Sequence, residues 1–80
     1  MEFNYNRLDQ YKPALDDGFK YTFHNNSKNY HLYIFKSRTE YVLTEENYPD
    51  KKIVFLIVKR NFEDFKREVK EYFEKNRGEN

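Results

Sequence analysis

The sequence predicts an α+β fold, a four-stranded antiparallel sheet in meander order with a C-terminal amphipathic helix on one face and a short N-terminal helix. Three observations support this class. The 80 residues include 8 Tyr and 8 Phe, whereas disordered chains are poor in aromatic residues. Apolar residues near the C-terminus recur at helical spacing. Upstream of them, short β-branched and aromatic stretches are separated by turn residues, which is typical of strands.

The C-terminal helix is predicted over residues 62–76. Asn61 stands where an N-cap is needed, and Gly78 is suited to end the helix. The apolar positions share one helical face, and they are Phe62, Phe65, Val69, Tyr72 and Phe73. We therefore expect this face to pack against the sheet.

Four stretches rich in β-branched and aromatic residues predict the strands, at residues 19–24, 30–36, 40–44 and 53–58. Residues 37–39 are short enough to connect the second and third strands as a hairpin. Residues 44–52 are interpreted as a loop because they contain polar residues and a proline turn. Residues 53–58 are continuously apolar, which favours a central strand or one that is covered on both faces.

The N-terminal segment is predicted to form a short helix over residues 4–11, from the near-helical spacing of Tyr5, Leu8 and Tyr11. Pro13 is expected to interrupt any longer helix. The Asp-Asp-Gly sequence at residues 16–18 predicts a turn.

The hydrophobic core is expected from the apolar faces of the strands and of the C-terminal helix. Its predicted members are Phe19, Tyr21, Phe23, Leu32, Ile34, Leu43, Val54, Phe55, Leu56, Ile57, Phe62, Phe65, Val69 and Phe73. One helix covers only one face of four strands, and the second and fourth strands are apolar on both faces. The spare face is covered by residues 1–17, by a partner or second copy of the chain, or it stays exposed. The sequence leaves these alternatives open.

Composition excludes several classes of protein. Fifteen Lys and Arg balance fourteen Asp and Glu, a net charge of +1, which argues against a strongly basic nucleic-acid wrapper and an acidic mimic of DNA. Cysteine is absent, so the chain forms no disulfide and no cysteine metal site. No apolar run approaches about 18 residues, and the N-terminus carries no secretion signal. We expect a single domain over residues 1–80 that does not bind membranes and resides in the cytoplasm, or in the host-cell cytoplasm for a viral protein.

No motif predicts an enzyme, a cofactor or a metal site. His24 and His31 flank a turn, and a pair of histidines needs a third ligand to hold a metal. With Gly at 2 positions, a phosphate-binding loop is excluded. A small ribonuclease that uses His31, Tyr33, Lys36 and Arg38 is the remaining catalytic hypothesis, although their spacing does not single them out.

Nucleic-acid binding is the alternative function. Basic residues concentrate in two stretches, residues 19–40 and 51–60. If the two stretches meet on the sheet beside Tyr21, Tyr33 and Phe35, they form a stacking platform with phosphate contacts. The basic residues of this hypothesis are Lys20, Lys36, Arg38, Lys51, Lys52, Lys59 and Arg60.

Protein binding is the function that the sequence favours. Tyrosine gives a large contact area at low entropic cost, and the acidic stretch over residues 40–50 is interpreted as a patch, carried by a loop, that meets a basic surface. The expected contacts are Tyr33, Phe35, Tyr41, Glu45, Glu46, Tyr48 and Asp50. In general style the chain resembles small phage-encoded inhibitors of host defence proteins, including anti-CRISPR proteins, although no motif carries this resemblance. It implies a viral or mobile-element inhibitor that binds a host protein or complex. A homodimer is also compatible with the pattern.

Overall fold

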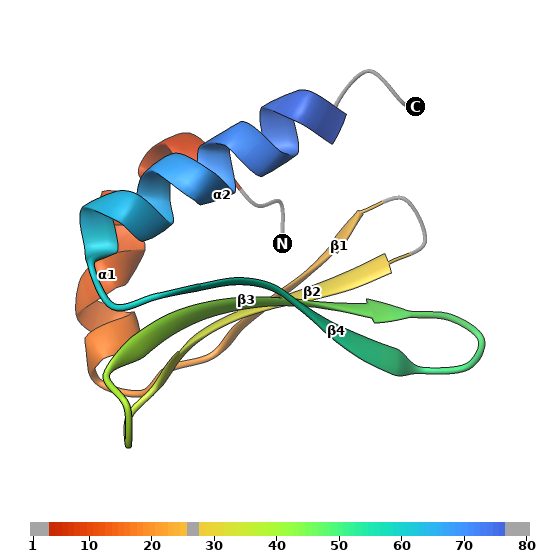
Figure 1. Cartoon of the computed structure of the whole chain (residues 1–80), viewed down its shortest axis with the longest axis horizontal. Helices are drawn as coiled ribbons and strands as arrows, with labels where there is room; N and C mark the ends of the chain where they lie inside the picture. The colour runs from red at the N-terminus through yellow and green to blue at the C-terminus, as the bar shows by residue number, and fades with distance from the viewer. Residues whose placement is uncertain (1–3, 26–27, 77–80) are drawn as a thin grey trace.

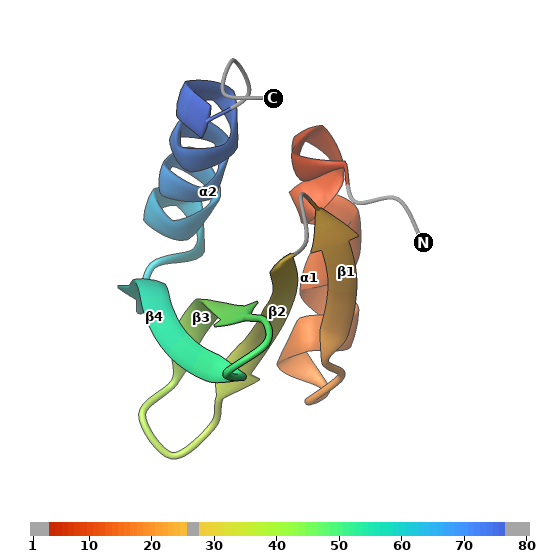
Figure 2. The same ribbon diagram turned by 90° about the vertical axis from the view of Figure 1, so that its right-hand side faces the viewer.

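The computed structural model describes residues 4–25 and 28–76. In chain order the elements are a 3₁₀ turn η1 (Tyr5–Arg7), α1 (Leu8–Asp16), β1 (Tyr21–Asn25), β2 (Lys28–Phe35), β3 (Glu40–Asn47), β4 (Lys52–Lys59) and α2 (Phe62–Asn76). The strands form one antiparallel sheet in the order β1-β2-β3-β4. Both helices lie on the same side of this sheet (Figures 1 and 2). The predicted fold class is therefore confirmed.

The sheet is built around the β2–β3 hairpin, which pairs from Lys28 opposite Asn47 to Phe35 opposite Glu40. The predicted tight connection closes it, and the Arg38 amide donates to the Phe35 carbonyl at 3.2 Å. β1 pairs with β2 along one edge, and β4 pairs with β3 along the other. Because side chains alternate along a strand, one residue in two faces the helices.

The predicted strand limits are wrong at several places. β2 begins at Lys28, not at residue 30, because Lys28 and Asn29 pair with β3, and it ends at Phe35. Residues 45–47, interpreted as loop, belong to β3, because Glu45 and Glu46 pair with Val54 and Ile53 of β4. Phe19 was expected to begin the first strand, but its amide donates to the Ala14 carbonyl at 2.9 Å. This bond serves the end of α1, so the strand begins at Tyr21 and the Phe19 side chain is exposed.

Helix α1 extends beyond the predicted short helix and passes through Pro13. Leu8 and Leu15, on either side of the proline, are both fully buried, and this packing offsets the hydrogen bond that Pro13 cannot donate. The helix ends in a Schellman motif at Gly18, whose φ of +93° is left-handed. The Gly18 amide donates to the Leu15 carbonyl at 2.9 Å.

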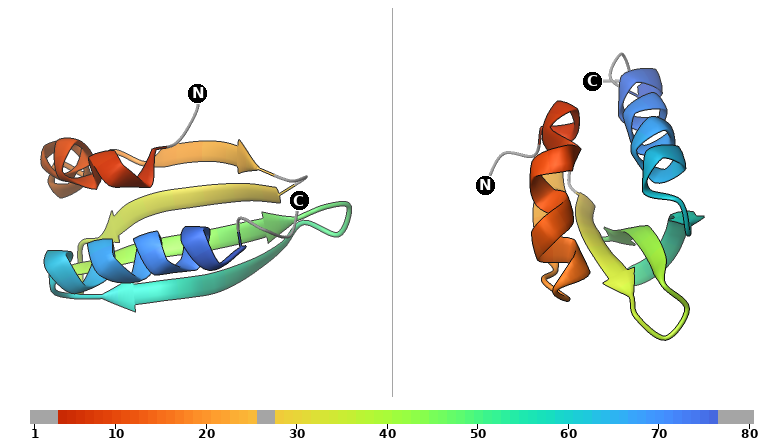
Figure 3. Two further views of the ribbon diagram at one scale, coloured as in Figure 1. Left: turned by 90° about the horizontal axis from the view of Figure 1, so that it is seen from above. Right: turned by 90° about the vertical axis from the view of Figure 1, so that its left-hand side faces the viewer.

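Helix α2 begins and ends as predicted, although Gly78 lies outside the described residues. The Asn61 Oδ1 accepts the Asp64 amide at 3.0 Å, which is the expected N-cap. Phe65 and Val69 are fully buried beneath the helix. Seen from above, α2 runs along β3 and β4 while α1 lies beside it over the β1 side (Figure 3). No helix in the described ranges is long and apolar enough to cross a membrane.

The core lies between the two helices and one face of the sheet. It contains most of the predicted residues and, in addition, Leu8, Leu15, Tyr30 and Tyr41. These four were not among the predicted core residues: Leu8 and Leu15 belong to α1, and Tyr30 and Tyr41 lie on β2 and β3. Val54 and Leu56 are only partly buried.

The prediction that the last strand is central or covered on both faces is wrong. β4 is an edge strand, and the core residue expected at Phe55 is 60% exposed. Phe55 is exposed because it lies on the face that no helix covers. A β-bulge also changes which residues of β4 share that face: Leu43 pairs with Ile57 and Thr44 with Phe55, so Leu56 is an extra residue. The bulge interrupts the alternation of side chains between the two faces. The continuous apolar sequence therefore does not indicate that one face of β4 is exposed.

The contrast between Phe65 and Phe55 gives a first prediction. Phe65→Ala should lower the free energy of unfolding by about 3–5 kcal/mol, because it leaves a cavity in the core. Phe55→Ala is the matched control and should cost less than about 1 kcal/mol, since this ring is largely in water already. Urea unfolding followed by circular dichroism measures both. Equal losses at the two positions would contradict the packing of α2 on the sheet.

Candidate functional site

The side of the sheet opposite α1 and α2 is called the open face here. Neither helix covers it (Figure 3). The helix side is identified by ring contacts such as Tyr41 with Phe62 and Tyr30 with Phe73, and the alternate residues of each strand point the other way. The open face therefore carries Thr22, His24, Asn29, His31, Tyr33, Phe35, Glu40, Val42, Thr44, Glu46, Ile53, Phe55 and Val58.

The β4 part of the open face is apolar. Ile53, Phe55 and Val58, called the β4 strip below, are 57%, 60% and 40% exposed. The neighbouring β3 residues Val42 and Thr44 are almost completely buried although no helix lies above them. Large apolar side chains that stay in water next to one another are unusual on a monomer and commonly mark an interaction site.

The β1 and β2 part of the open face is polar and is crossed by two hydrogen-bonded rows. In the first row, the His31 Nδ1 lies 3.0 Å from the Thr22 hydroxyl, and its Nε2 lies 3.2 Å from Glu46 Oε1. The carboxylate only accepts, so a neutral His31 donates from Nε2 and accepts the Thr22 proton at Nδ1. Both ring nitrogens of His31 therefore form hydrogen bonds, and these bonds connect β2 to β1 and to β3.

The second row lies closer to the β3–β4 loop. The His24 Nδ1 donates to Asn29 Oδ1 at 2.8 Å, and the Asn29 amide donates to the Tyr48 hydroxyl at 2.6 Å. Together the rows hold both histidines in one layer of polar side chains on one face. In the described ranges, no group of three His, Cys, Asp or Glu residues is placed to hold a metal ion.

Two predicted basic residues lie over aromatic rings of the open face. Lys20 Nζ is 5.5 Å from the Tyr33 ring centroid, and the Arg38 guanidinium is 5.8 Å from the Phe35 ring centroid. These contacts are cation–π interactions, and they place positive charge beside the half-buried Tyr33 ring and the exposed Phe35 ring.

The predicted basic set is divided between the two ends of the sheet. The end that carries the β2–β3 hairpin is called the basic end, and it comprises Lys20, Lys36, Arg38 and Arg60. Lys59 lies near this end and pairs with Glu68 of α2 at 2.9 Å. Lys51 and Lys52 lie at the opposite end, where β4 begins. The two basic stretches therefore meet at the basic end only in part.

The expected contact residue Glu45 is buried on the helix side, not exposed in a loop. Its Oε1 accepts the Tyr72 hydroxyl at 3.2 Å and lies 3.5 Å from Lys28 Nζ. Burial, hydrogen bonding with Tyr72 and the nearby Glu45 charge raise the pKa of the neighbouring Tyr30. Glu45 thus stabilises the interior and has little surface for a partner.

Tyr41 is likewise buried, and its hydroxyl donates to Asp16 Oδ1 at 2.6 Å. Asp16 also accepts from Lys12 at 2.8 Å. The hydrogen bond from Lys12 and that from Tyr41 lower the pKa of the Asp16 carboxyl. This contact fastens the end of α1 to β3.

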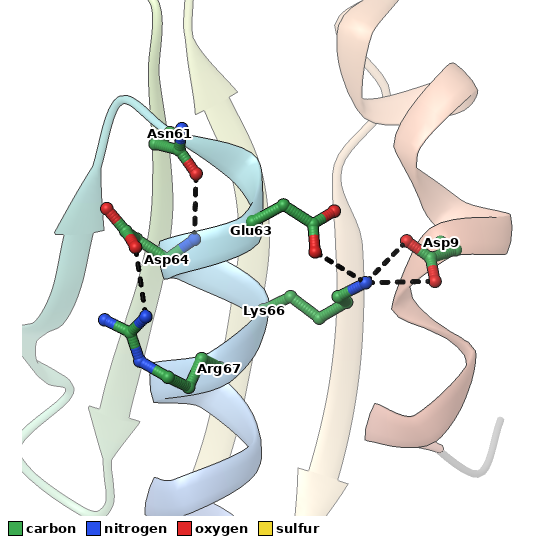
Figure 4. Close-up of polar contacts among 6 residues, drawn as sticks. All are labelled: Asp9, Asn61, Glu63, Asp64, Lys66 and Arg67. Atoms are coloured by element: carbon green, nitrogen blue, oxygen red, sulfur yellow. Dashed lines mark hydrogen bonds and ion pairs between the residues drawn. The ribbon is translucent and has the colours of Figure 1, made fainter.

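Two grooves flank α2. One, of about 450 Å³, lies between α1 and α2, where Lys66 Nζ bridges Asp9 at 3.1 Å and Glu63 at 3.1 Å (Figure 4). The second, of about 410 Å³, is called the α2–β4 groove. It is lined by Leu56, Ile57, Arg67, Glu68, Glu71, Tyr72 and Lys75. In the first groove, ion pairs connect the two helices. The second groove opens beside the edge strand β4.

Of the predicted protein contacts, Tyr33, Phe35 and Glu46 share the open face, while Tyr48 and Asp50 are exposed in the adjoining loop. The β4 strip was missed. The spare apolar surface of the fourth strand was the signal for it, but the bulge concealed which residues were involved. No family model, no curated protein and no solved structure matches the chain. The function is therefore inferred from the chemistry of these surfaces.

The Asp16 contact gives a prediction of pH dependence. Because the folded pKa of Asp16 lies below its unfolded value, the ionised carboxylate stabilises the fold above about pH 4 and ceases to do so as the pH falls through the folded pKa. Asp16→Asn should cost about 1 kcal/mol or less at pH 7, since the side chain is partly in solvent. Thermal melts from pH 7 to pH 2 should show the gap between wild type and variant narrowing below pH 4. A gap that is constant with pH would contradict the assignment.

Proposed function

We propose that the protein is a non-catalytic protein-binding module whose contact surface is the open face. The observation that carries this proposal is the β4 strip, three large apolar side chains exposed side by side on one strand. Covering a side chain such as Phe55 contributes about 1.5–3 kcal/mol. An aromatic anchor of this kind is the usual centre of a binding energy hot spot.

The rigidity of the surface also supports protein binding. The β4 strip belongs to a hydrogen-bonded strand, and Tyr33 and Phe35 extend the apolar surface across β2. A strand backbone that is already ordered loses little further conformational entropy when a partner docks. The proposed inhibitor role, with a host protein or complex as target, remains a prediction from the sequence.

The hypothesis of a small ribonuclease gains less support. Its expected centre, His31, uses both ring nitrogens in contacts with Thr22 and Glu46. The two grooves described above flank α2 on the other side of the sheet. A catalytic histidine would need a free nitrogen in reach of the substrate.

Capture experiments test the protein-binding proposal. Immobilised protein should retain a partner from an extract of its source cells, and nuclease treatment should not release it. Phe55→Ser should reduce retention at least about tenfold, because it removes a central apolar contact. Phe19→Ser is the matched control, since Phe19 is similarly exposed but precedes β1 and contacts the helix-side residue Tyr21. Equal retention by the two variants would reject the open face as the contact surface.

Binding to single-stranded nucleic acid is the second candidate, and it rests on a separate observation. Lys20 and Arg38 lie over Tyr33 and Phe35 on the open face. A sheet that presents aromatic rings beside cations is suited to stack bases and to contact phosphates.

A salt titration tests the second candidate. A mixed single-stranded oligonucleotide pool should bind at low salt, and its affinity should fall steeply as salt is raised, because bound counterions are released. Fluorescence anisotropy measures the affinity. Arg38→Ala should weaken binding, whereas Lys70→Ala on α2 should leave it unchanged. Undetectable binding at low salt would reject this candidate.

A further inference from the structure

The outer edge of β4 offers a backbone template. In the described part of the chain, β3 is the only strand beside β4. Alternate N–H and C=O groups of an edge strand point away from the sheet and can pair with an added strand. The other edge, β1, is shorter, and it carries Thr22 and His24 on the open face. β4 is therefore the edge on which a partner strand would gain more apolar contact.

The surroundings of β4 fit both sides of an added strand. On the open face lies the β4 strip, and on the helix side lies the α2–β4 groove with Leu56 and Tyr72 in its wall. Because the side chains of a strand alternate, an added strand would direct one set over the strip and the other set into the groove. Main-chain pairing then supplies affinity and the two surfaces supply specificity.

The charges at the ends of β4 define what kind of strand fits. Lys51 and Lys52 stand at its beginning and Arg60 follows its end. Asp50 lies in the loop beyond the first pair. An apolar segment with acidic residues at both ends complements this arrangement.

The same charges argue against a second copy of the chain as the occupant. In symmetric antiparallel pairing of two β4 strands, Lys52 would lie opposite Lys59 of the other copy. Like charges that face each other across strands are unfavourable. Terminal lysines are among the devices that protect edge strands from self-association.

We propose that β4 binds an extended segment of a partner protein by strand addition. In the middle of this segment every second residue is apolar, and both of its ends are acidic. The inference rests on the proposed protein-binding function and specifies the chemistry of the partner. The backbone edge, the β4 strip and the α2–β4 groove bind the middle, and Lys51, Lys52 and Arg60 bind the ends.

A synthetic peptide tests the proposal with the full-length protein. The probe is Glu-Glu-Val-Thr-Val-Thr-Val-Glu-Glu, whose side-chain order reads the same in both directions, so strand direction does not affect the test. Its affinity is measured by calorimetry or by chemical-shift changes. A version with Lys in place of every Glu should bind at least about tenfold more weakly, because it repels both ends of β4. Equal binding of the two peptides, or no binding of the acidic one, would overturn the proposal.

Backbone methylation separates strand addition from simple hydrophobic contact. One analogue is N-methylated at the three Val residues and another at the two Thr residues. In an added strand, alternate amides point towards the neighbour. One analogue should therefore lose binding about tenfold or more while the other retains it. If both bind as the parent does, strand pairing is excluded.

Charge reversal on the protein supplies the matched variants. Lys52→Glu combined with Arg60→Glu should reverse the preference, so that the lysine peptide binds better than the acidic one. Lys70→Glu, on the other groove of α2, should leave the preference unchanged. Circular dichroism checks that each variant is folded. An unchanged preference in the folded double variant would overturn the assignment of the end charges.

Other occupants and failures are distinguishable. Light scattering should give a monomer without peptide, and a dimer that the peptide does not dissociate would show that a second copy occupies the edge and would overturn the proposal. If Phe55→Ser abolishes capture of a partner while neither peptide binds, protein binding stands and strand addition fails. If substitutions in and beside β4 change neither the capture of a partner nor the binding of the peptide, both proposals fail.

Discussion

The packing of both helices on one face of a single sheet is the constraint on which the rest of the structure depends. Leu8 and Leu15 of α1 join Phe65 and Val69 of α2 in one core. The buried leucines of α1 therefore cover the helix side of the sheet and not the opposite face. No helix shields the open face from water, so only its own side chains can bury one another.

The two halves of the open face differ in how their side chains interact with one another and with water. Across β1, β2 and β3, histidine, threonine and glutamate side chains satisfy one another through hydrogen bonds, as in the contact of His31 with Glu46. Along β4 there is no such network, and Ile53, Phe55 and Val58 remain in contact with water. An exposed apolar edge is normally a liability for aggregation. Here the lysines at both ends of β4 oppose self-pairing.

The two candidate functions use different parts of the same face. The β4 strip favours an apolar protein contact, while Lys20 and Arg38 over their aromatic rings favour an anionic one. An acidic protein segment with an apolar middle would satisfy the strip and the flanking cations together. A nucleic acid would use the rings and cations but would leave the strip uncovered. This difference favours a protein partner.

Local signals in the sequence were sufficient for most of the fold. The cap at Asn61 and the helical spacing of Phe65 and Val69 defined α2, because both act within a few residues. Turn residues and strand composition likewise indicated four strands and the β2–β3 hairpin. That Tyr33 and Phe35 share one face of their strand followed from simple alternation, and the structure places both on the open face.

What could not be read from the sequence depends on contacts between distant segments. The passage of α1 through Pro13 is stabilised by burial of Leu8 and Leu15 against the sheet and α2, not by local propensity. The exposure of Phe55 follows from the pairing of β4 with β3, where a bulge shifts the two faces. A run of apolar residues indicates how much apolar surface a segment has. Strand order and helix placement determine which part of that surface is buried.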